Sequence, residues 1–260
     1  MRKRLDLALV ERGLADSRSL AQALILEGKV RVAGQVERKA SRQVDETCDL
    51  KVEEPARFVS RGGEKLEGAF RSWDSLSAQG RICIDVGSST GGFTDCLLQH
   101  GAEFVMAVDV GTNQLAYKLR SDPRVWVREN YNARYMKSGD LPKVPSLAVT
   151  DVSFISLKLI LPPIVDVLAP GGEIVALIKP QFEVGRGNAP GGLVKDETLR
   201  IAARDGIVGF AVGELGLELL GLAESPIKGR EMGNTEYLSY WRKKGDREWC
   251  AKQSSAELTE

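Results

Sequence analysis

The sequence predicts an α/β fold: a mostly parallel sheet of seven strands with helices on both faces, preceded by a small α+β unit. The central observation is the stretch Ile82–Phe93, where an apolar run stops at an acid and continues into a glycine-rich turn. A helix follows, and strand, turn and helix in that order form the first βα unit of an open sheet. Alternating strands and helices downstream predict parallel pairing. The last two strands have no helix between them, which predicts an antiparallel hairpin at one edge.

Each further element is predicted by an apolar run and by the residues that end it. Two prolines at 162 and 163 predict a break or kink in the apolar helix that spans 155–168. A weaker helical pattern covers 131–138. The strands expected after the first are 104–108, 125–127, 146–149, 173–178, 217–223 and 237–241. The expected helices are 64–70, 94–100, 114–120, 155–168 and 196–215, and a glycine-rich loop covers 181–195.

Residues 1–55 are expected to form a unit of their own. A short amphipathic helix over 5–12 ends at Gly13, and a second helix, capped by Asp16 or Ser17, ends at Gly28. Short strands follow near 29–32, 36 and 49–52. The expected organisation is therefore an N-terminal domain over 1–55, a linker over 56–63, a main domain over 64–246 and a polar tail over 247–260.

Composition excludes several classes of protein. Lys+Arg and Asp+Glu balance at 36 each, so the whole chain has no charge that indicates a nucleic-acid partner. No apolar run reaches 18 residues, which argues against a membrane span. The four cysteines show no CxxC spacing, and the opening residues lack a signal-peptide core. We expect a soluble, cytoplasmic protein without a membrane partner; its oligomeric state does not follow from the sequence.

The glycine turn is expected to bind a ligand at the helix N-terminus. A dinucleotide site takes G-x-G-x-x-G, whereas this turn reads Gly87-x-x-x-Gly91-Gly92. S-adenosylmethionine has no pyrophosphate and suits this turn, which opens with Asp85, better. Asp109, at the end of the next strand, lies where such folds grip a ribose. The alternatives are dinucleotide binding, or a turn that only packs a helix on a strand.

Polar residues end successive strands of the expected sheet. Asp85, Asp109, Asp151 and Lys179 fall at or near the carboxyl edge, where open α/β sheets bind ligands. The single histidine, His100, lies at a helix end beside glycine and is expected to be a cap. Any proton acceptor must then be Lys, Asp or Glu, and no metal site is expected.

The N-terminal unit has an uneven charge. Residues 1–44 hold ten Lys/Arg and five Asp/Glu, a surplus sufficient for several phosphate contacts. Its pattern, with Leu5-Asp6, 13–19, Ala23 and 28–32, resembles the S4-type RNA-binding module. The resemblance implies RNA rather than duplex DNA as the partner. The basic residues expected to contact RNA are Arg2, Arg4, Arg18, Lys29 and Arg31.

Four motifs of the main domain resemble those of the TlyA (hemolysin A) family. They are the stretch 85–95, Thr150-Asp-Val-Ser-Phe-Ile-Ser156, Leu177-Ile-Lys-Pro-Gln-Phe-Glu183 and Asn234-Thr-Glu-Tyr237. The resemblance implies a Rossmann-like class I methyltransferase that is FtsJ-like and methylates a ribose 2′-hydroxyl of ribosomal RNA, free or in ribosomal subunits, with cytidine as the expected nucleotide. The usual middle glycine is replaced by Ser89. S-adenosylmethionine is the implied cofactor, held by Asp85, Gly87, Ser88, Ser89, Thr90, Gly91, Gly92, Phe93, Asp109 and Asn130.

The resemblance also implies a catalytic tetrad: Lys65, Asp151, Lys179 and Glu236. A ribose hydroxyl is a poor nucleophile until its proton is taken or its developing charge is stabilised. Two neighbouring ammonium groups disfavour each other's charge, so one lysine can act as the base while the acids orient the pair. Lys179 is the expected base or hydroxyl-orienting group. The alternative functions are a membrane-active hemolysin and an inactive RNA-binding protein.

Overall fold

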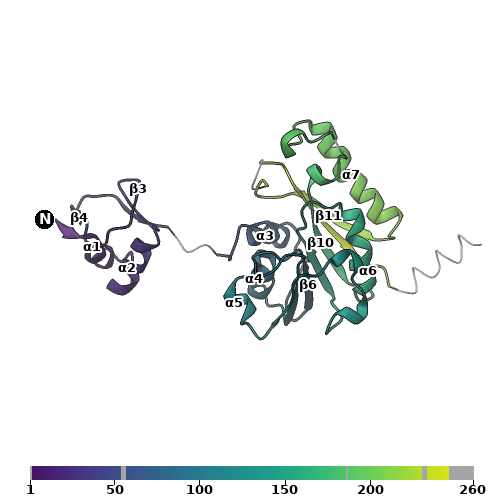
Figure 1. Ribbon diagram of the computed structural model, residues 1–260, viewed down its shortest axis with the longest axis horizontal. Helices are drawn as coiled ribbons and strands as arrows, with labels where there is room; N and C mark the ends of the chain where they lie inside the picture. Colours follow the sequence, from purple (N-terminus) through teal and green to yellow (C-terminus); the bar gives the residue numbers. More distant parts are fainter. Residues whose placement is uncertain (1, 54–56, 186, 230–232, 246–260) are drawn as a thin grey trace, which may run out of the picture. The chain divides into compact units, whose positions relative to one another are not determined.

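The computed structural model describes residues 2–53, 57–185, 187–229 and 233–245 and divides into two compact units, between Arg57 and Phe58 (Figure 1). We describe each unit by itself. The expected polar tail, 247–260, lies outside the described residues.

The N-terminal unit contains both predicted helices, α1 (Leu5–Glu11) and α2 (Arg18–Leu26). Ser17 caps α2, because its side chain accepts a hydrogen bond from the Leu20 amide. Three short strands pair in the order β3-β2-β5, and a further pair, β1 with β4, was not predicted because two-residue strands show no periodicity. The strands are β1 (Lys3–Arg4), β2 (Val30–Val32), β3 (Gln35–Glu37), β4 (Gln43–Val44) and β5 (Leu50–Val52).

The second unit is built on a seven-stranded sheet in the order β11-β12-β10-β9-β6-β7-β8. Strands β8, β7, β6, β9 and β10 are parallel, and β12 pairs antiparallel with both β10 and β11. The predicted α/β class and edge hairpin are confirmed. The strands are β6 (Ile82–Val86), β7 (Phe104–Val108), β8 (Val125–Arg128), β9 (Leu147–Thr150), β10 (Glu173–Ile178), β11 (Glu218–Glu224) and β12 (Tyr237–Arg242).

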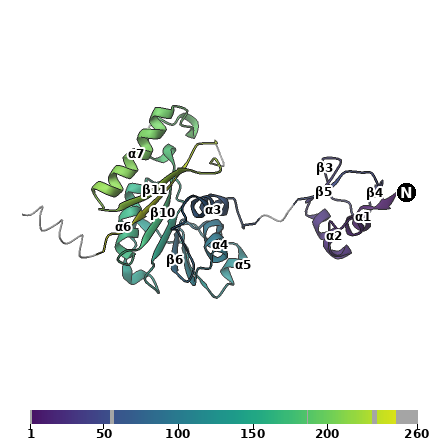
Figure 2. The same cartoon turned by 180° about the vertical axis from the view of Figure 1, so that it is seen from behind.

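Helices cover both faces of this sheet (Figure 2). On one face α3, α4 and α5 pack on alternate strand residues such as Cys83 and Val105. On the other face α6 and α7 pack on the intervening residues, among them Ile84 and Met106. The helices are α3 (Gly62–Ser72), α4 (Gly92–Gln99), α5 (Tyr117–Arg120), α6 (Leu161–Val167) and α7 (Glu197–Gly213).

Helix boundaries differ from the prediction at several places. The prolines at 162 and 163 do not kink a long helix; they occupy the first turn of α6, where proline fits because no amide partner is lost, and the 3₁₀ turn Leu157–Leu159 precedes it. Residues 131–138 form no α-helix but contribute to two 3₁₀ turns, Ala133–Tyr135 and Ser138–Asp140. Helix α3 begins two residues earlier than expected.

The chain order places the ligand site. From β6 the chain adds β7 and β8 on one side and then returns to β9 on the other, so the order reverses between β6 and β9. Ligands of open α/β sheets bind at such a switch point, outside the carboxyl ends of the strands. Gly87 follows β6 there with φ +83°, and a Cβ on it would lie 3.0 Å from the Val152 side chain. The close approach of the two loops therefore requires glycine.

Candidate active site

Four charged side chains meet at the carboxyl edge of the sheet. Lys65 comes from α3, Asp151 follows β9, Lys179 follows β10 and Glu236 precedes β12. Because β12 is antiparallel to β10, with Ile178 opposite Tyr237, the start of β12 lies beside the end of β10. Residues distant in sequence are thereby brought together.

The four charges form an alternating chain. The Lys65 Nζ atom lies 2.7 Å from Glu236 Oε2 and 3.5 Å from Asp151 Oδ2, and Lys179 Nζ lies 2.6 Å from Asp151 Oδ1. Lys179 also donates a hydrogen bond of 2.8 Å to Ser153 Oγ. Lys65, Lys179 and Glu236 are each at most 8% exposed. Two cations and two anions balance, which limits the cost of burying them.

A cavity of about 310 Å³, which we call the lysine pocket, is lined by three of these groups, Lys65, Lys179 and Glu236. The Phe154 side chain is 82% exposed at the pocket, with its ring centroid 5.2 Å from that of Phe182. Asn234 holds another part of the wall, accepting from the Val194 amide and donating to the Gly192 carbonyl. The lining residues are Lys65, Ser153, Phe154, Lys179, Gln181, Phe182, Ala189, Gly191, Gly192, Gly229, Asn234 and Glu236.

A second cavity of about 550 Å³, the glycine-loop pocket, lies over β6 and β7. Asp109 organises its floor: one carboxylate oxygen accepts from the Ser89 amide and the other from the Gly111 amide, both at 2.7 Å. Ser89 has φ +47°, the left-handed conformation that glycine adopts without strain. Ser153 and Phe154 line both pockets, so the two cavities adjoin.

The predicted cofactor residues divide into two groups. Gly87, Ser89 and Asp109 line the glycine-loop pocket, whereas Asp85, Ser88, Thr90, Gly91, Gly92, Phe93 and Asn130 do not. A Cβ on Gly91 would lie 2.3 Å from Leu119, and one on Gly92 would lie 2.8 Å from the Gly63 amide nitrogen. These two glycines let helices approach closely, which is the packing alternative that the sequence left open. Val110, Gln114, Tyr131, Asn132 and Ala133 line the pocket and were not predicted, because no motif marks them.

Asp85 lies in β6, just before the glycine loop, and is fully buried. Burial raises its pKa to about 7, although the Thr94 hydroxyl donates a hydrogen bond of 2.6 Å to it. Its other carboxylate oxygen has no hydrogen-bond partner within the described part of the chain. Asp85 therefore connects β6 to the first turn of α4.

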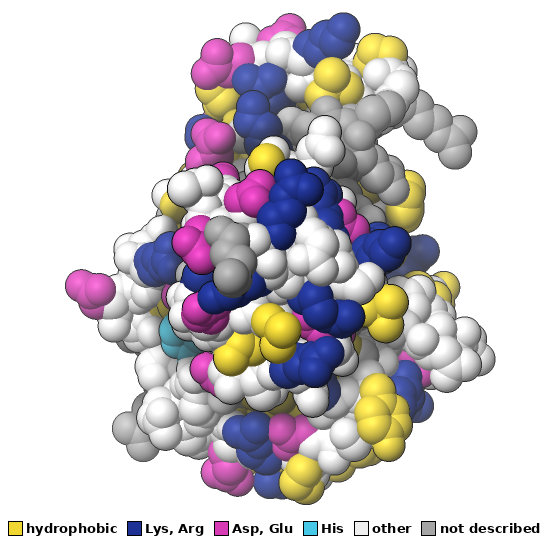
Figure 3. All heavy atoms as spheres, turned by 90° about the vertical axis from the view of Figure 1, so that its left-hand side faces the viewer, with side chains coloured by type: hydrophobic (Ala, Val, Ile, Leu, Met, Phe, Trp, Pro, Cys, Tyr) yellow, Lys and Arg dark blue, Asp and Glu magenta, His cyan; other side chains and the backbone are white. Residues whose placement is uncertain are grey.

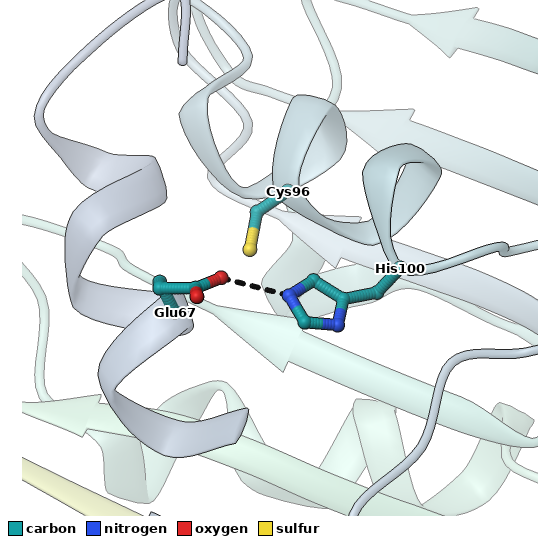
Figure 4. Close-up of side chains that lie close together, drawn as sticks. All are labelled: Glu67, Cys96 and His100. Carbon is teal, nitrogen blue, oxygen red and sulfur yellow. Dashed lines mark hydrogen bonds and ion pairs between the residues drawn. The ribbon is translucent and has the colours of Figure 1, made fainter. Parts of the chain in front are cut away.

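His100 ends α4, as predicted, and its ring contacts α3 (Figure 4). Its Nε2 atom lies 2.8 Å from a Glu67 carboxylate oxygen, and its ring stacks on Phe70. Cys96 lies beside this pair, with the three possible ligand atoms within 4.8 Å of one another. Glu67 is also paired with Arg71, and we assign no metal to this group, which connects α3 to α4.

The predicted RNA-binding residues of the N-terminal unit all form ion pairs. Asp6, 0% exposed, binds both Arg4 and Arg18, and the Arg4 hydrogen bond holds the Asp6 pKa well below its usual range. The other three pairs are Arg2–Asp45, Lys29–Glu27 and Arg31–Glu53. Figure 3 shows Lys and Arg side chains beside Asp and Glu side chains on the surface of the chain.

Comparison with protein-family models decides the family. The model of the FtsJ-like methyltransferases matches residues 58–243, and that of the S4 domain matches residues 3–49. The chain belongs to the FtsJ-like methyltransferase family. The predicted S4-type module and methyltransferase fold are thus confirmed.

Relatives of this FtsJ-like chain bear two kinds of name. The Mycobacterium tuberculosis 16S/23S rRNA (cytidine-2′-O)-methyltransferase TlyA is 45% identical over 96% of this chain and 94% of its own. Hemolysin A of Brachyspira hyodysenteriae is 43% identical over 92% of this chain and 99% of its own. A solved Streptococcus thermophilus structure named as a hemolysin is 43% identical, with a TM-score of 0.72, and covers 94% of this chain and 89% of its own. In the described part of this FtsJ-like chain, every helix is too short or too polar to cross a membrane.

Proposed function

We propose that this chain transfers a methyl group from S-adenosylmethionine to the ribose 2′-hydroxyl of a cytidine in ribosomal RNA. The observation that carries the proposal is the pair of adjoining pockets. One is lined by the glycine loop and Asp109, the other contains two buried lysines, and Ser153 and Phe154 border both. Such an arrangement lets a donor and an acceptor meet at one point. The name of the Mycobacterium tuberculosis relative supports cytidine and ribosomal RNA.

The glycine-loop pocket fits the donor. Gly87 leaves the backbone open to a close approach, and the Asp109 carboxylate faces the pocket with lone pairs that the two backbone amides leave free. Asp109 is the group that would accept hydrogen bonds from the donor ribose. Residues 131–133, together with Val110, would border the adenine. When bound, the donor supplies an electrophilic sulfonium methyl group.

The tetrad would prepare the acceptor. Lys179 is held between Asp151 and Ser153, and it is the group that would orient the 2′-hydroxyl and, once it has lost its own proton and become a neutral amine, take the hydroxyl proton. Lys65, fixed by Glu236, would hold the same oxygen from the α3 side. Because methyl transfer is an in-line displacement, alignment of the two substrates would supply much of the rate.

The lysine pocket suits a nucleotide that is out of a duplex. Phe154 and Phe182 present aromatic faces at the pocket, and unpaired RNA bases stack on such side chains. The N-terminal unit would supply the phosphate contacts. Asp6 fixes Arg4 and Arg18, so guanidinium N–H groups that Asp6 does not use are oriented before RNA binds. A ribosomal substrate would place the protein in the cytoplasm.

The test is methyl transfer from labelled donor to ribosomal RNA, either naked or in each ribosomal subunit. We expect label in RNA, at a nucleotide whose 3′ phosphodiester then resists alkali because its 2′-oxygen is blocked. Label on a base, or no label in RNA, would contradict the proposal. Release of dye from vesicles without methyl transfer would instead favour the hemolysin alternative.

A further inference from the structure

The loop between β9 and the 3₁₀ turn at Leu157 has an unusual backbone. Phe154, at its centre, has φ +63°. This left-handed conformation is unfavourable for any residue other than glycine, and it persists only when the surrounding structure stabilises it. The same residue is 82% exposed, so burial of its own ring does not provide the holding force. Contacts on either side of Phe154 must supply it.

Two contacts attach this loop to the segment after β10. At the front, Lys179 binds Asp151 and Ser153. At the back, Glu183 accepts hydrogen bonds from the Ser156 hydroxyl at 2.5 Å and from the Leu157 amide at 2.8 Å, one on each carboxylate oxygen. Lys179 and Glu183 are joined by the short 3₁₀ turn Pro180–Phe182, which fixes the spacing between the two attachments.

Glu183 is well placed to hold the loop but not to react. The Glu183 side chain is absent from the lining of the lysine pocket, and both of its oxygens are occupied by Ser156 and Leu157. Burial raises its pKa, opposed by those two hydrogen bonds and by the charge of Lys158. A partly buried carboxylate with two short, directed bonds is a rigid connection.

We infer that Glu183 is a positioning residue for the proposed methyl transfer: it fixes the 151–156 loop so that Ser153 and Phe154 keep their places between the two pockets. The expected effect of Glu183 on the reaction rate rests on the proposed function, whereas its expected effect on the loop does not. Without Glu183 the loop loses both hydrogen bonds on the Leu157 side, and Phe154 can leave the left-handed conformation. A shift of about 1 Å at reacting groups can cost about 100-fold in rate.

The test compares Glu183→Ala with Glu183→Gln, and uses Glu214→Ala as a control. Glutamine can still accept from the Leu157 amide and donate to the Ser156 oxygen, so it keeps the connection without the charge. We expect E183A to lower kcat roughly 10- to 100-fold and to change the donor Kd less than about 3-fold. E183Q and E214A should stay within about 3-fold of the original kcat. Glu214 is exposed at the end of α7 and serves as a matched loss of a carboxylate.

Amide hydrogen exchange gives a readout that does not depend on activity. The Leu157 amide should exchange faster in E183A and keep its protection in E183Q. Amide exchange can be measured even if the original protein methylates no RNA. A failure of the proposed function can therefore be distinguished from a failure of the role assigned to Glu183. Unchanged exchange of Leu157 in E183A, or an unchanged kcat, would overturn the inference.

Two further outcomes are decisive. If E183Q is as slow as E183A, the carboxylate charge matters and Glu183 does not act by position. If E183A fails to fold, Ser156→Ala removes one of the two bonds and should lower kcat in the same direction by a smaller factor. Full activity in S156A, with unchanged exchange at Leu157, would then reject the assignment.

Discussion

The Lys65 ammonium group lies 2.7 Å from the Glu236 carboxylate, although 171 residues separate the two in sequence. Both side chains are buried, Glu236 to 2% exposure, and an Asp151 oxygen lies 3.5 Å from the Lys65 Nζ atom. Each buried charge is therefore stabilised by the opposite charge, which compensates for the loss of its hydration. This contact connects α3 to the start of β12 and so joins the two ends of the methyltransferase unit at the site.

Removal of one partner should be more costly than removal of both. We expect Lys65→Ala to lower the free energy of unfolding by about 3 kcal/mol or more, because it removes the cation that pairs with buried Glu236 in the described part of the chain. In the double variant Lys65→Ala/Glu236→Ala part of this loss should be recovered. Urea denaturation of both single variants and the double variant measures the coupling, with Glu64→Ala, an exposed acid of α3, as the control. Additive losses would show that the pair contributes no mutual stabilisation.

Donor binding should depend on Asp109. Asp109→Ala removes a charged acceptor that faces the glycine-loop pocket and also releases the Ser89 amide. A hydrogen bond to a charged group contributes roughly 1.5–3 kcal/mol, so affinity for S-adenosylmethionine should fall about 10- to 150-fold. Calorimetry on the folded variant measures this, and Asp74→Ala, at an exposed position outside both pockets, is the control. An unchanged Kd would remove Asp109 from the donor site.

Stability should depend on pH through Asp85. Its pKa is about 7 in the folded chain and 3.8 ordinarily, so between these values the folded protein keeps a proton that the unfolded chain releases. Stability from this group is therefore greatest below about pH 4 and is lost as the pH rises to 7, by up to about 4 kcal/mol. Asp85→Asn lacks this titration. From pH 5 to pH 8 the free energy of unfolding of the variant should therefore rise relative to that of the original protein. The same difference at the two pH values would contradict the raised pKa of Asp85.

The segment before α3 should affect the donor site. Phe58 is 3% exposed and packs against Gly63, and the Val59 amide donates to Asp95 at 2.8 Å. A chain beginning at Ala56 should therefore bind S-adenosylmethionine more tightly than one beginning at Gly63, since α3 and α4 lose these contacts in the shorter chain. Both chains should bind RNA more weakly, and with less salt dependence, than the full chain. Equal donor affinity would make the segment a passive tether, and unchanged RNA affinity would reject the role of the N-terminal unit.

Hydrophobic periodicity and turn residues predicted the sheet well because its strands are buried and bounded by strong signals. Strand β10, for example, was predicted with the bounds it has, between a glycine turn and Lys179. The prolines of α6 misled the prediction because proline breaks a helix interior but suits a helix start. Local patterns could not distinguish the two positions.

The residues of the site were predicted less completely than the strands. The four tetrad residues were predicted from the family resemblance, because no local sequence pattern indicates that Glu236 lies beside Lys65. The antiparallel pairing of β10 with β12 brings these two residues together. The glycines of the turn have two different roles, which the motif alone does not distinguish. Gly87 lines the glycine-loop pocket, whereas Gly92 allows α3 and α4 to pack closely against each other. Tyr131 and Asn132 line the pocket from an irregular segment without a motif. Their place is set by tertiary structure alone.

The role of Lys179 is tested by the single-turnover rate of methyl transfer to ribosomal RNA in Lys179→Ala, with Lys158→Ala as the control. Lys158 is an exposed lysine of the neighbouring 3₁₀ turn Leu157–Leu159. Its replacement by alanine removes one positive charge, as K179A does, but outside the lysine pocket. We expect K179A to be slower by about 100- to 10,000-fold, the usual contribution of a positioned base, while K158A stays within about 3-fold. Adding Asp151→Ala to K179A should cost little more, because the residues act as a unit. Near-original turnover in K179A would contradict the proposal that Lys179 orients and deprotonates the 2′-hydroxyl.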